Sequence, residues 1–249
     1  MTTDHLLDRF RAALAPLEPL ALWAHGSLAG GDYREGRSDL DLIAVLPGPV
    51  RPVTAWRVAV VHQSLRAEPL AGGLHCSYLT PATAADPARG HLTWAHGGLT
   101  RRPVTPVTRR ELHTFGRVLA GAAPTGLLPP VTDAELAAFV VADQRDYWRP
   151  ALDDARLWTR DIWIDLGLIT HARAAVTLRE GRLITKREAL AELLALGAPP
   201  EAVEDVRLRR YGGGTASAPM AGEAWRERRA GLVCGWLGRS VDRLVAAYG

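Results

Sequence analysis

Two aspartates one residue apart follow a glycine–serine pair near the front of the chain. The stretch "HGSLAGGDYREGRSDLDLIAVL" spans residues 25–46, and Asp39 follows Ser27 by twelve positions (39 − 27 = 12). Side chains alternate along a strand, so Asp39 and Asp41 point to one face and the leucines beside them to the other. Two neighbouring carboxylates repel each other unless a cation lies between them, and Mg²⁺ prefers carboxylates together with phosphate oxygens. The pattern therefore predicts a magnesium site.

The preceding Gly26–Ser27 pair has the properties of a phosphate-binding turn. A glycine without Cβ leaves its backbone N–H groups accessible, and the Ser27 hydroxyl adds a donor for phosphate oxygens. A phosphate-binding turn beside a metal-binding pair suits phosphoryl or nucleotidyl transfer. The alternative is a plain hairpin with a capped strand. The combination of both motifs with an apolar strand on each side favours transfer chemistry.

The elements that must position these residues form a small mixed α/β domain over residues 1–130. Apolar spacing and strand composition predict its elements. We expect helices over residues 1–14 and 55–69, and strands over residues 19–26, 39–46 and 73–80. The segment 99–131 contains five prolines and one expected helix around Glu111–Leu119, which is typical of a bridge between domains.

Residues 131–249 show helical spacing throughout, so we expect an all-α bundle after the sheet domain, and an α+β chain overall. Thr132 or Asp133 is the expected N-cap of the first helix, with Glu135 in its first turn. The expected helices cover residues 131–148, 151–178, 185–196, 200–211 and 222–248.

Composition narrows the classes of function. The formal charge of +3 over 249 residues suits a polyphosphate ligand and is too small to indicate a nucleic-acid binder. Cys76 and Cys234 have no metal-ligand spacing, which favours a reducing cytoplasm. The charged N-terminal helix is unlike a signal peptide, and no apolar run is long enough to span a bilayer. We expect a cytoplasmic monomer without membrane or nucleic-acid partners.

The residues "HGS" and "RSDLDLIAVL" resemble the signature of the polymerase-beta-type nucleotidyltransferases. The helical second half narrows the resemblance to the streptomycin/spectinomycin adenylyltransferases, a class of aminoglycoside nucleotidyltransferase. The resemblance implies an N-terminal nucleotidyltransferase domain and a C-terminal helical domain that close around ATP–Mg²⁺ and the acceptor. The implied reaction transfers AMP from ATP to a hydroxyl of an aminoglycoside or aminocyclitol, and it confers antibiotic resistance.

The resemblance also implies roles for individual residues. Asp39 and Asp41 match the metal-binding pair and the catalytic centre. Those that match nucleotide contacts are Gly26, Ser27, Ser38, Lys186 and Tyr211. Those that match acceptor contacts are Trp94 and Asp161, or Asp165 if the register differs by one turn.

One departure from the family's pattern affects catalysis. The family has a glutamate on the third strand as the base that deprotonates the acceptor hydroxyl, and here His75 stands at that position. A second acidic residue of the family is replaced by Val104 or Thr105. Histidine acts as a base near neutral pH. The replacement is equally consistent with an enzyme that has lost turnover.

Six aspartates and four aromatic residues lie between residues 143 and 165, a composition that suits a polycationic acceptor. Four arginines in the same stretch offer the alternative of a solvated, salt-bridged helix. Taken alone, Trp94 is more often a core residue and Lys186 a surface residue. Two other functions stay open: a nucleotidyltransferase acting on another small-molecule or protein hydroxyl, and a nucleotide-binding module or antitoxin-like partner without turnover.

Overall fold

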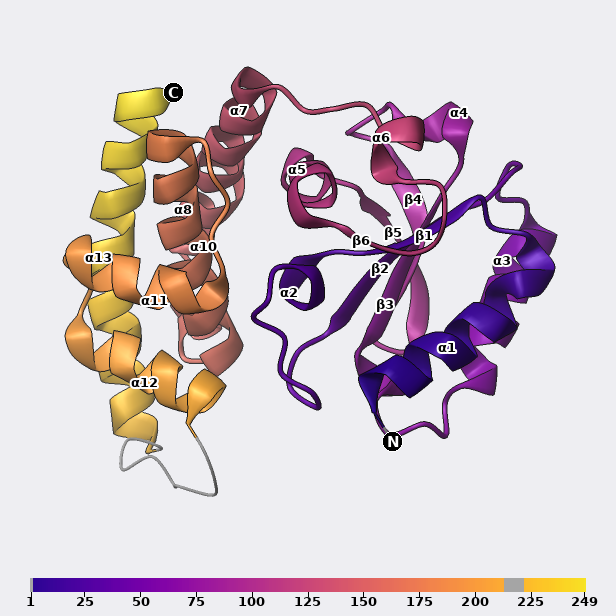
Figure 1. Ribbon diagram of the computed structural model, residues 1–249. Coiled ribbons are helices and arrows are strands. Elements are labelled where there is room, and N and C mark those ends of the chain that lie inside the picture. Colours follow the sequence, from indigo (N-terminus) through magenta and orange to yellow (C-terminus); the bar gives the residue numbers. More distant parts are fainter. Residues whose placement is uncertain (1, 213–221) are drawn as a thin grey trace. The chain divides into compact units, whose positions relative to one another are not determined.

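The computed structural model describes residues 2–212 and 222–249. The chain divides into two compact units, Met1–Thr132 and Asp133–Gly249, called here the sheet unit and the helical unit. The sheet unit is drawn in indigo to magenta, and the helical unit continues through orange to yellow (Figure 1). The boundary expected between residues 130 and 131 lies next to the observed one. Each unit has its own buried core.

The sheet unit is built on a six-stranded sheet with the order β5-β4-β3-β2-β1-β6. Its strands are β1 (Ala21–Ala24), β2 (Leu40–Val45), β3 (Leu74–Leu79), β4 (Gly90–Ala95), β5 (Gly98–Pro103) and β6 (Arg117–Gly121). Only β2 and β3 pair in parallel, and the other pairs are antiparallel. The mixed sheet expected from the sequence is therefore confirmed.

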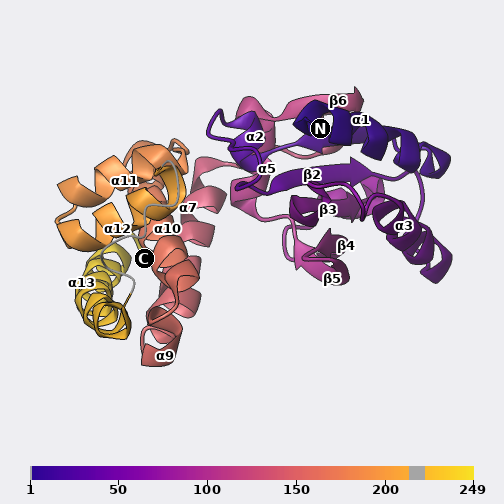
Figure 2. The same cartoon turned by 90° about the horizontal axis from the view of Figure 1, so that it is seen from below.

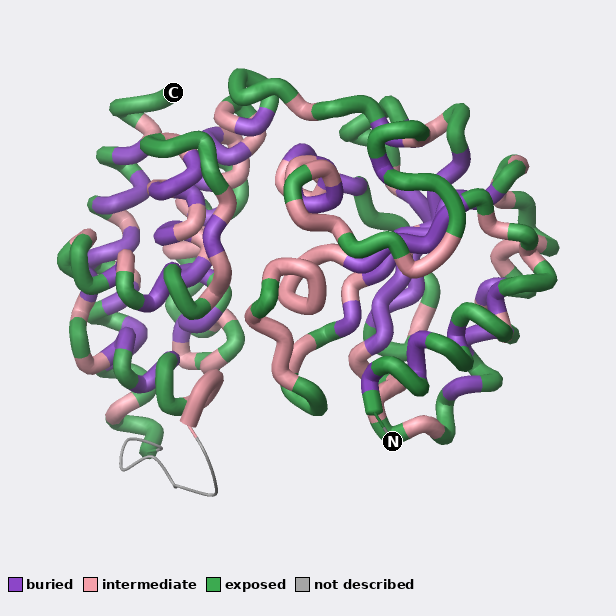
Figure 3. Tube along the Cα trace, viewed as in Figure 1, coloured by how far each residue is buried: buried purple, intermediate pink, exposed green. Residues whose placement is uncertain are grey.

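Helices α1 (Thr3–Leu14) and α3 (Pro52–Ser64) cover one face of this sheet (Figures 1 and 2). The Thr2 side chain caps α1 by accepting a hydrogen bond from the His5 N–H. Apolar side chains at helical spacing then bury one stripe of α1 against the sheet. Figure 3 shows that the buried residues of this unit concentrate in the strands.

The segment expected to bridge two domains is part of the sheet unit. His96 and Gly97 form the two-residue turn between β4 and β5, with positive φ angles of 51° and 77°. The helix expected at 111–119 is instead α5 (Pro106–Phe115), which is capped by Gly116 and followed directly by β6. The helix starts earlier than expected because Pro106 favours the first position of a helix. It also ends earlier, because Gly116 favours helix termination.

Short helices complete the sheet unit. They are η1 (Ala15–Leu17), α2 (Gly26–Ala29), η2 (Ala71–Gly73), α4 (Pro81–Ala84) and α6 (Pro124–Leu127). The face of the sheet opposite α1 and α3 is covered by side chains of α4 and α5 and of the segment around Leu128, which pack on Trp23 and Ile43. The Trp23 indole N–H donates to the carbonyl of Ala122 at 2.7 Å, so the largest buried side chain of this face leaves no donor unsatisfied.

The helical unit is all-α, as expected. Its elements are α7 (Asp133–Asp143), the π-helix η3 (Gln144–Trp148), α8 (Arg149–Ala151), α9 (Ala155–Trp158), α10 (Asp161–Glu180), α11 (Lys186–Ala195), α12 (Pro200–Tyr211) and α13 (Glu223–Tyr248). The helix expected at 151–178 is interrupted, because the Asp154 side chain caps a new short helix by accepting from the Arg156 N–H. The two long helices α10 and α13 lie side by side (Figures 1 and 2).

The core of the helical unit is centred on Trp158. A Cβ at Gly167 in α10 would lie 2.5 Å from the Trp158 ring, so only a glycine lets the helix approach this closely. The Trp158 indole N–H is satisfied by the Ala151 carbonyl at 2.9 Å.

Among the described residues, no helix is both long and apolar enough to cross a membrane. The α+β fold class predicted from the sequence is confirmed.

Candidate active site

The Gly-Ser turn lies directly against the second aspartate of the pair. Gly26 begins α2 with a φ of +61°, and a Cβ at this position would lie 2.8 Å from Oδ2 of Asp41. The His25 N–H donates to the Asp41 carbonyl at 3.0 Å, which continues the pairing of β1 with β2. Only a glycine combines this left-handed backbone with this closeness to a carboxylate.

The two aspartates occupy the entry to β2. Asp41 lies within the strand with a side chain that is 36% exposed, while Leu40 and Leu42 are buried on the other face. Asp39 immediately precedes the strand and is exposed. Its Oδ1 lies 3.7 Å from the position of a Cβ on Gly73, the residue before β3. The alternation expected from the sequence is present, with both carboxylates at the same edge of the sheet.

A divalent cation fits the chemistry of this pair. Among the described residues, no three His, Cys, Asp or Glu side chains are grouped to hold a metal ion by themselves. A site of two carboxylates matches Mg²⁺, which completes its coordination with waters and substrate phosphates. The glycine beside Asp41 leaves a space next to Oδ2 that a Cβ would fill.

His75 lies beside Asp41, as its predicted role requires. The two residues are partners in the parallel register of β2 and β3, and His75 Nδ1 lies 3.8 Å from Asp41 Oδ1. The His75 ring is buried and packs edge-on against His96, with 4.6 Å between ring centroids. Its Nε2 has no hydrogen-bond partner among the described residues. This nitrogen is a buried polar atom next to the acidic pair.

Ser27 and Ser38 stand at the two ends of the loop that joins α2 to β2. Ser27 is the second residue of α2, and its carbonyl accepts from the Asp32 N–H at 3.1 Å. The Ser38 Oγ accepts from the Arg34 N–H at 3.0 Å, which closes a tight turn before Asp39. Ser27 thus follows the glycine that lies against Asp41, and Ser38 directly precedes Asp39.

One buried carboxylate at this turn was missed by sequence reasoning. Glu111 of α5 accepts from the Gly26 N–H at 3.2 Å, and the same oxygen lies 3.2 Å from His25 Nδ1. The Gly26 amide, expected to be open to phosphate, is thus occupied by a carboxylate. Residues 26 and 111 are 85 positions apart, and no local spacing in the sequence marks the contact.

Trp94, expected to line the acceptor pocket, packs in the core of the sheet unit. It pairs with Cys76 across β3 and β4, so it points to the face opposite His75. Its ring stacks on His62 of α3 with 4.7 Å between centroids, and the residue is 8% exposed. The structure therefore gives Trp94 a packing role.

In the helical unit, the two candidate acceptor aspartates are held by arginines. Asp161 is 2.7 Å from Arg229, and Asp165 is 2.6 Å from Arg209. Partial burial opposes ionisation of Asp161, but the Arg229 hydrogen bond and the Arg209 charge outweigh it and lower its pKa. Burial raises the pKa of Asp165 despite the Arg209 charge. Asp161 and Asp165 thus pair with arginines of α13 and α12, whereas Arg149 and Asp153 form a pair within the stretch itself, as the salt-bridged alternative expected.

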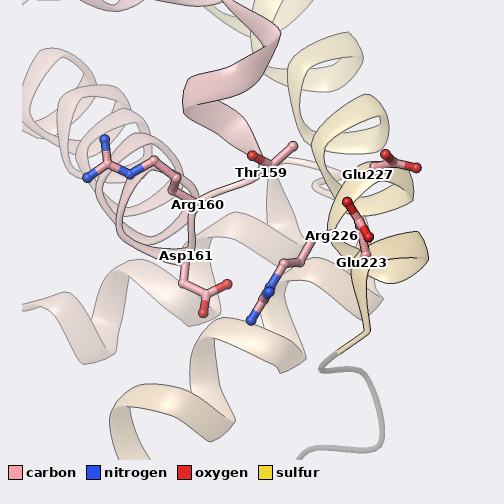
Figure 4. Close-up of a pocket in the computed structure, with 6 residues that line it drawn as sticks. All are labelled: Thr159, Arg160, Asp161, Glu223, Arg226 and Glu227. Carbon is pink, nitrogen blue, oxygen red and sulfur yellow. The ribbon is translucent and has the colours of Figure 1, made fainter.

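Asp161 also borders a hollow of about 610 Å³ at the start of α10 and α13. Figure 4 shows the Asp161 carboxylate and the Arg226 guanidinium pointing toward one another, while Arg160 and Glu227 point away. The lining residues are Thr159, Arg160, Asp161, Glu223, Arg226 and Glu227. Three carboxylates and two guanidinium groups leave the lining with one excess negative charge. Sequence reasoning had singled out only Asp161 of this set.

Lys186 and Tyr211 lie at neighbouring helix ends. Lys186 is the first residue of α11, whose N-terminus is closed by a capping box between Thr185 and Glu188. Tyr211 is the last residue of α12, and the Arg187 guanidinium lies 4.3 Å from the centre of its ring. Arg187, the residue after Lys186, is thus the side chain that the structure places on the Tyr211 ring.

Neither a known family of sequences nor a curated protein matches the chain. Among solved structures, it is similar to the spectinomycin adenyltransferase AAD(9) from Enterococcus faecialis, crystallised with ATP and spectinomycin. The likeness has a TM-score of 0.72 at 13% sequence identity and covers 97% of this chain and 100% of that one. This chain therefore shares the fold of spectinomycin adenyltransferase.

Proposed function

We propose that this protein is a nucleotidyltransferase that moves AMP from ATP–Mg²⁺ to a hydroxyl of an aminoglycoside or aminocyclitol. The observation that carries the proposal is the contact of Gly26 with the Asp41 carboxylate. It joins a glycine–serine turn to an acidic pair at one edge of the sheet. The shared fold with an adenyltransferase solved with ATP and spectinomycin supports the same assignment.

Within this proposal, the residues of the sheet unit have separate roles in binding the metal ion and the phosphates. Asp39 and Asp41 hold the Mg²⁺, which neutralises charge on the triphosphate when it is bound. Ser27 and Ser38 bind phosphate oxygens through their hydroxyl groups. The acceptor oxygen attacks the α-phosphorus, the bond from that phosphorus to the β-phosphate oxygen breaks, and pyrophosphate leaves with the electron pair.

His75 is the proposed base for the acceptor hydroxyl. The imidazole stands next to the proposed metal ligand Asp41, with Nδ1 3.8 Å from Asp41 Oδ1. In this proposal the proton of the acceptor hydroxyl passes to the His75 imidazole while the acceptor oxygen bonds to phosphorus.

In the helical unit, the proposal assigns ligand contacts to residues that the family resemblance selects. Lys186 and Tyr211 bind the nucleotide through charge and ring contact. Asp161 is 44% exposed, borders the hollow and offers negative charge for an ammonium group of the acceptor, and Arg229 holds its carboxylate in place. Asp165 is buried against Arg209, so it supports this acidic position from behind.

Pyrophosphate release from ATP in the presence of Mg²⁺ and spectinomycin or streptomycin tests the proposal. We expect Asp39→Asn and Asp41→Asn each to reduce turnover by about a hundredfold or more, since an amide oxygen binds Mg²⁺ without a compensating charge. Asp8→Asn is the matched control, because Asp8 lies on the exposed surface of α1. Turnover that survives both substitutions at the acidic pair would exclude the mechanism.

A nucleotide-binding module without turnover is the second candidate, and the histidine at position 75 favours it. A thermal-shift series with ATP–Mg²⁺ measures binding apart from catalysis, since a ligand of the folded state raises the midpoint. ATP binding with no pyrophosphate release from any hydroxyl acceptor, in both the wild type and His75→Glu, would favour this candidate. Release with a different hydroxyl acceptor would keep the chemistry and change the substrate.

A further inference from the structure

The Glu111 carboxylate holds the start of the glycine–serine turn. Its Oε2 lies 3.2 Å from the Gly26 nitrogen and 3.2 Å from His25 Nδ1, so a single oxygen bridges two consecutive residues. Glu111 is 5% exposed, which shields these contacts from water. The bridge ties α5 to the phosphate turn across 85 positions of sequence.

A second contact from α5 holds the other end of α2. Phe115 follows Glu111 by one helical turn, so both side chains project from the same face. A Cβ at Gly30, the residue that ends α2, would lie 3.5 Å from the Phe115 ring. The two helices lie side by side (Figures 1 and 2). Since α2 has only four residues, its orientation depends on such contacts.

Occupation of the Gly26 amide has a consequence for where phosphate binds. The carboxylate takes up the Gly26 N–H, and its negative charge repels a phosphate oxygen that approaches the same N–H. Phosphate oxygens are therefore received from Ser27 onward. The carboxylate also stabilises the left-handed backbone that keeps Gly26 against Asp41.

We propose that Glu111 is a positioning residue for the nucleotide. It fixes His25, Gly26 and Ser27 so that Ser27 meets the triphosphate beside the Asp39–Asp41 pair. This inference rests on the proposed function of that site. Without Glu111, the Gly26 amide is open to phosphate and the turn relaxes, so the triphosphate shifts along the turn and the α-phosphorus is misplaced.

Kinetics with ATP as the varied substrate form one arm of the test. We expect Glu111→Ala to lower kcat by about tenfold or more and to change the KM for ATP, since small displacements of reacting groups are costly. The KM for the acceptor should stay unchanged. Glu111→Gln keeps a side-chain oxygen for the Gly26 N–H and should retain most of the wild-type kcat. Glu68→Ala is the matched control, because Glu68 pairs with Arg9 away from the turn.

Nuclear magnetic resonance without nucleotide forms the second arm. In the wild type, the Gly26 amide should exchange slowly with solvent and resonate downfield, as a carboxylate-bonded N–H does. Glu111→Ala should abolish both properties, and Glu68→Ala should preserve them. If Glu111→Ala does not fold, Glu111→Asp replaces it, since its carboxylate is one methylene short of the turn.

The two arms separate the possible failures. An unchanged Gly26 amide in Glu111→Ala, or unchanged kcat and KM for ATP in the same variant, overturns the inference. If the wild type neither binds ATP nor releases pyrophosphate, the proposed function has failed and the nucleotide role of Glu111 fails with it. The Gly26 amide then still shows whether the contact with Glu111 exists, so the two failures are told apart.

Discussion

At the scale of single residues, the candidate site depends on the absence of a side chain at Gly26. This residue combines a φ of +61° with a position where a Cβ would lie 2.8 Å from the Asp41 carboxylate. Both features exclude other amino acids, and for different reasons. The first is a property of the backbone alone, and the second is a contact with a proposed metal ligand.

We expect Gly26→Ala to lower the free energy of unfolding by about 1–3 kcal/mol and to abolish the ATP-dependent thermal shift. The methyl group strains the left-handed backbone and displaces Asp41. Gly31→Ala is the matched control, because Gly31 has a φ of +78° with nothing within 4 Å of the added Cβ. The free energy of unfolding of Gly31→Ala, measured by urea denaturation, should fall, while its ATP-dependent thermal shift should be kept. Equal shifts in the wild type and Gly26→Ala would contradict the placement of Asp41.

At the scale of elements, buried pairs lock the helices onto their neighbours. In the sheet unit, Trp94 of β4 stacks on His62 of α3. In the helical unit, Arg229 of α13 is 1% exposed and bonds both Asp161 of α10 and Asp205 of α12. The first contact is an aromatic stack and the second a set of ion pairs, so substitutions change the free energy of unfolding for different reasons.

Truncation of Trp94 should cost stability in proportion to its burial. We expect Trp94→Ala to lower the free energy of unfolding by about 3–5 kcal/mol, and Trp94→Phe by less. Trp56 of α3 is 65% exposed, so Trp56→Ala should change the free energy of unfolding by no more than about 0.5 kcal/mol. Urea denaturation of the three variants provides the measurement. A small loss for Trp94→Ala would show that the indole is not part of the core.

Removal of Arg229 should leave a buried carboxylate without its partner. Arg229→Ala is expected to cost about 3–5 kcal/mol, because Asp205 is buried and, among the described residues, keeps Arg209 as its remaining arginine partner. Replacing both partners together, Arg229→Met with Asp205→Leu, should cost less than the single change. The neighbouring Arg228 is exposed and pairs with Glu201, so Arg228→Ala should cost no more than about 1 kcal/mol. A double variant less stable than Arg229→Ala would be inconsistent with this account.

At the scale of the whole molecule, each unit buries a histidine that stays neutral. Burial lowers the pKa of His62 in the sheet unit to about 3, with a smaller effect of His75. Burial also lowers the pKa of His171 in the helical unit to about 4, with a smaller effect of Arg243. In the unfolded chain both titrate near their ordinary value of 6.5. Both units therefore contain a group whose protonation favours unfolding.

This linkage predicts a loss of stability on acidification. The contribution of each histidine is complete above pH 6.5 and is lost as the pH falls toward its folded value, by about 1.4 kcal/mol per pH unit. Urea unfolding between pH 6 and pH 4 should show this slope. His62→Gln keeps a partner for the Tyr78 hydroxyl and should flatten the slope by that amount, while His5→Gln at the exposed start of α1 should leave it unchanged. An identical slope in the wild type and His62→Gln would refute the assignment.

Much of the fold could be predicted because its signals are local. Strand alternation predicted β2 and the shared face of Asp39 and Asp41, and helical spacing predicted the all-α second half. The segment after residue 98 was misread because it is rich in proline, yet Pro103 ends β5, and Pro106 and Pro124 begin α5 and α6. The pairing of β6 with β1 depends on a partner far away in sequence, which a local pattern does not contain.

For the candidate site, the sequence by itself determined the glycine–serine turn, the acidic pair and the histidine on the next strand. These residues are recognisable because their types and spacing are set by the strands that hold them. Only the tertiary structure decided that Glu111 occupies the Gly26 amide, that Trp94 belongs to the core, and that arginines hold Asp161 and Asp165. Each of these depends on which distant segments meet in the folded chain, and such meetings follow from packing and burial rather than from spacing along the sequence.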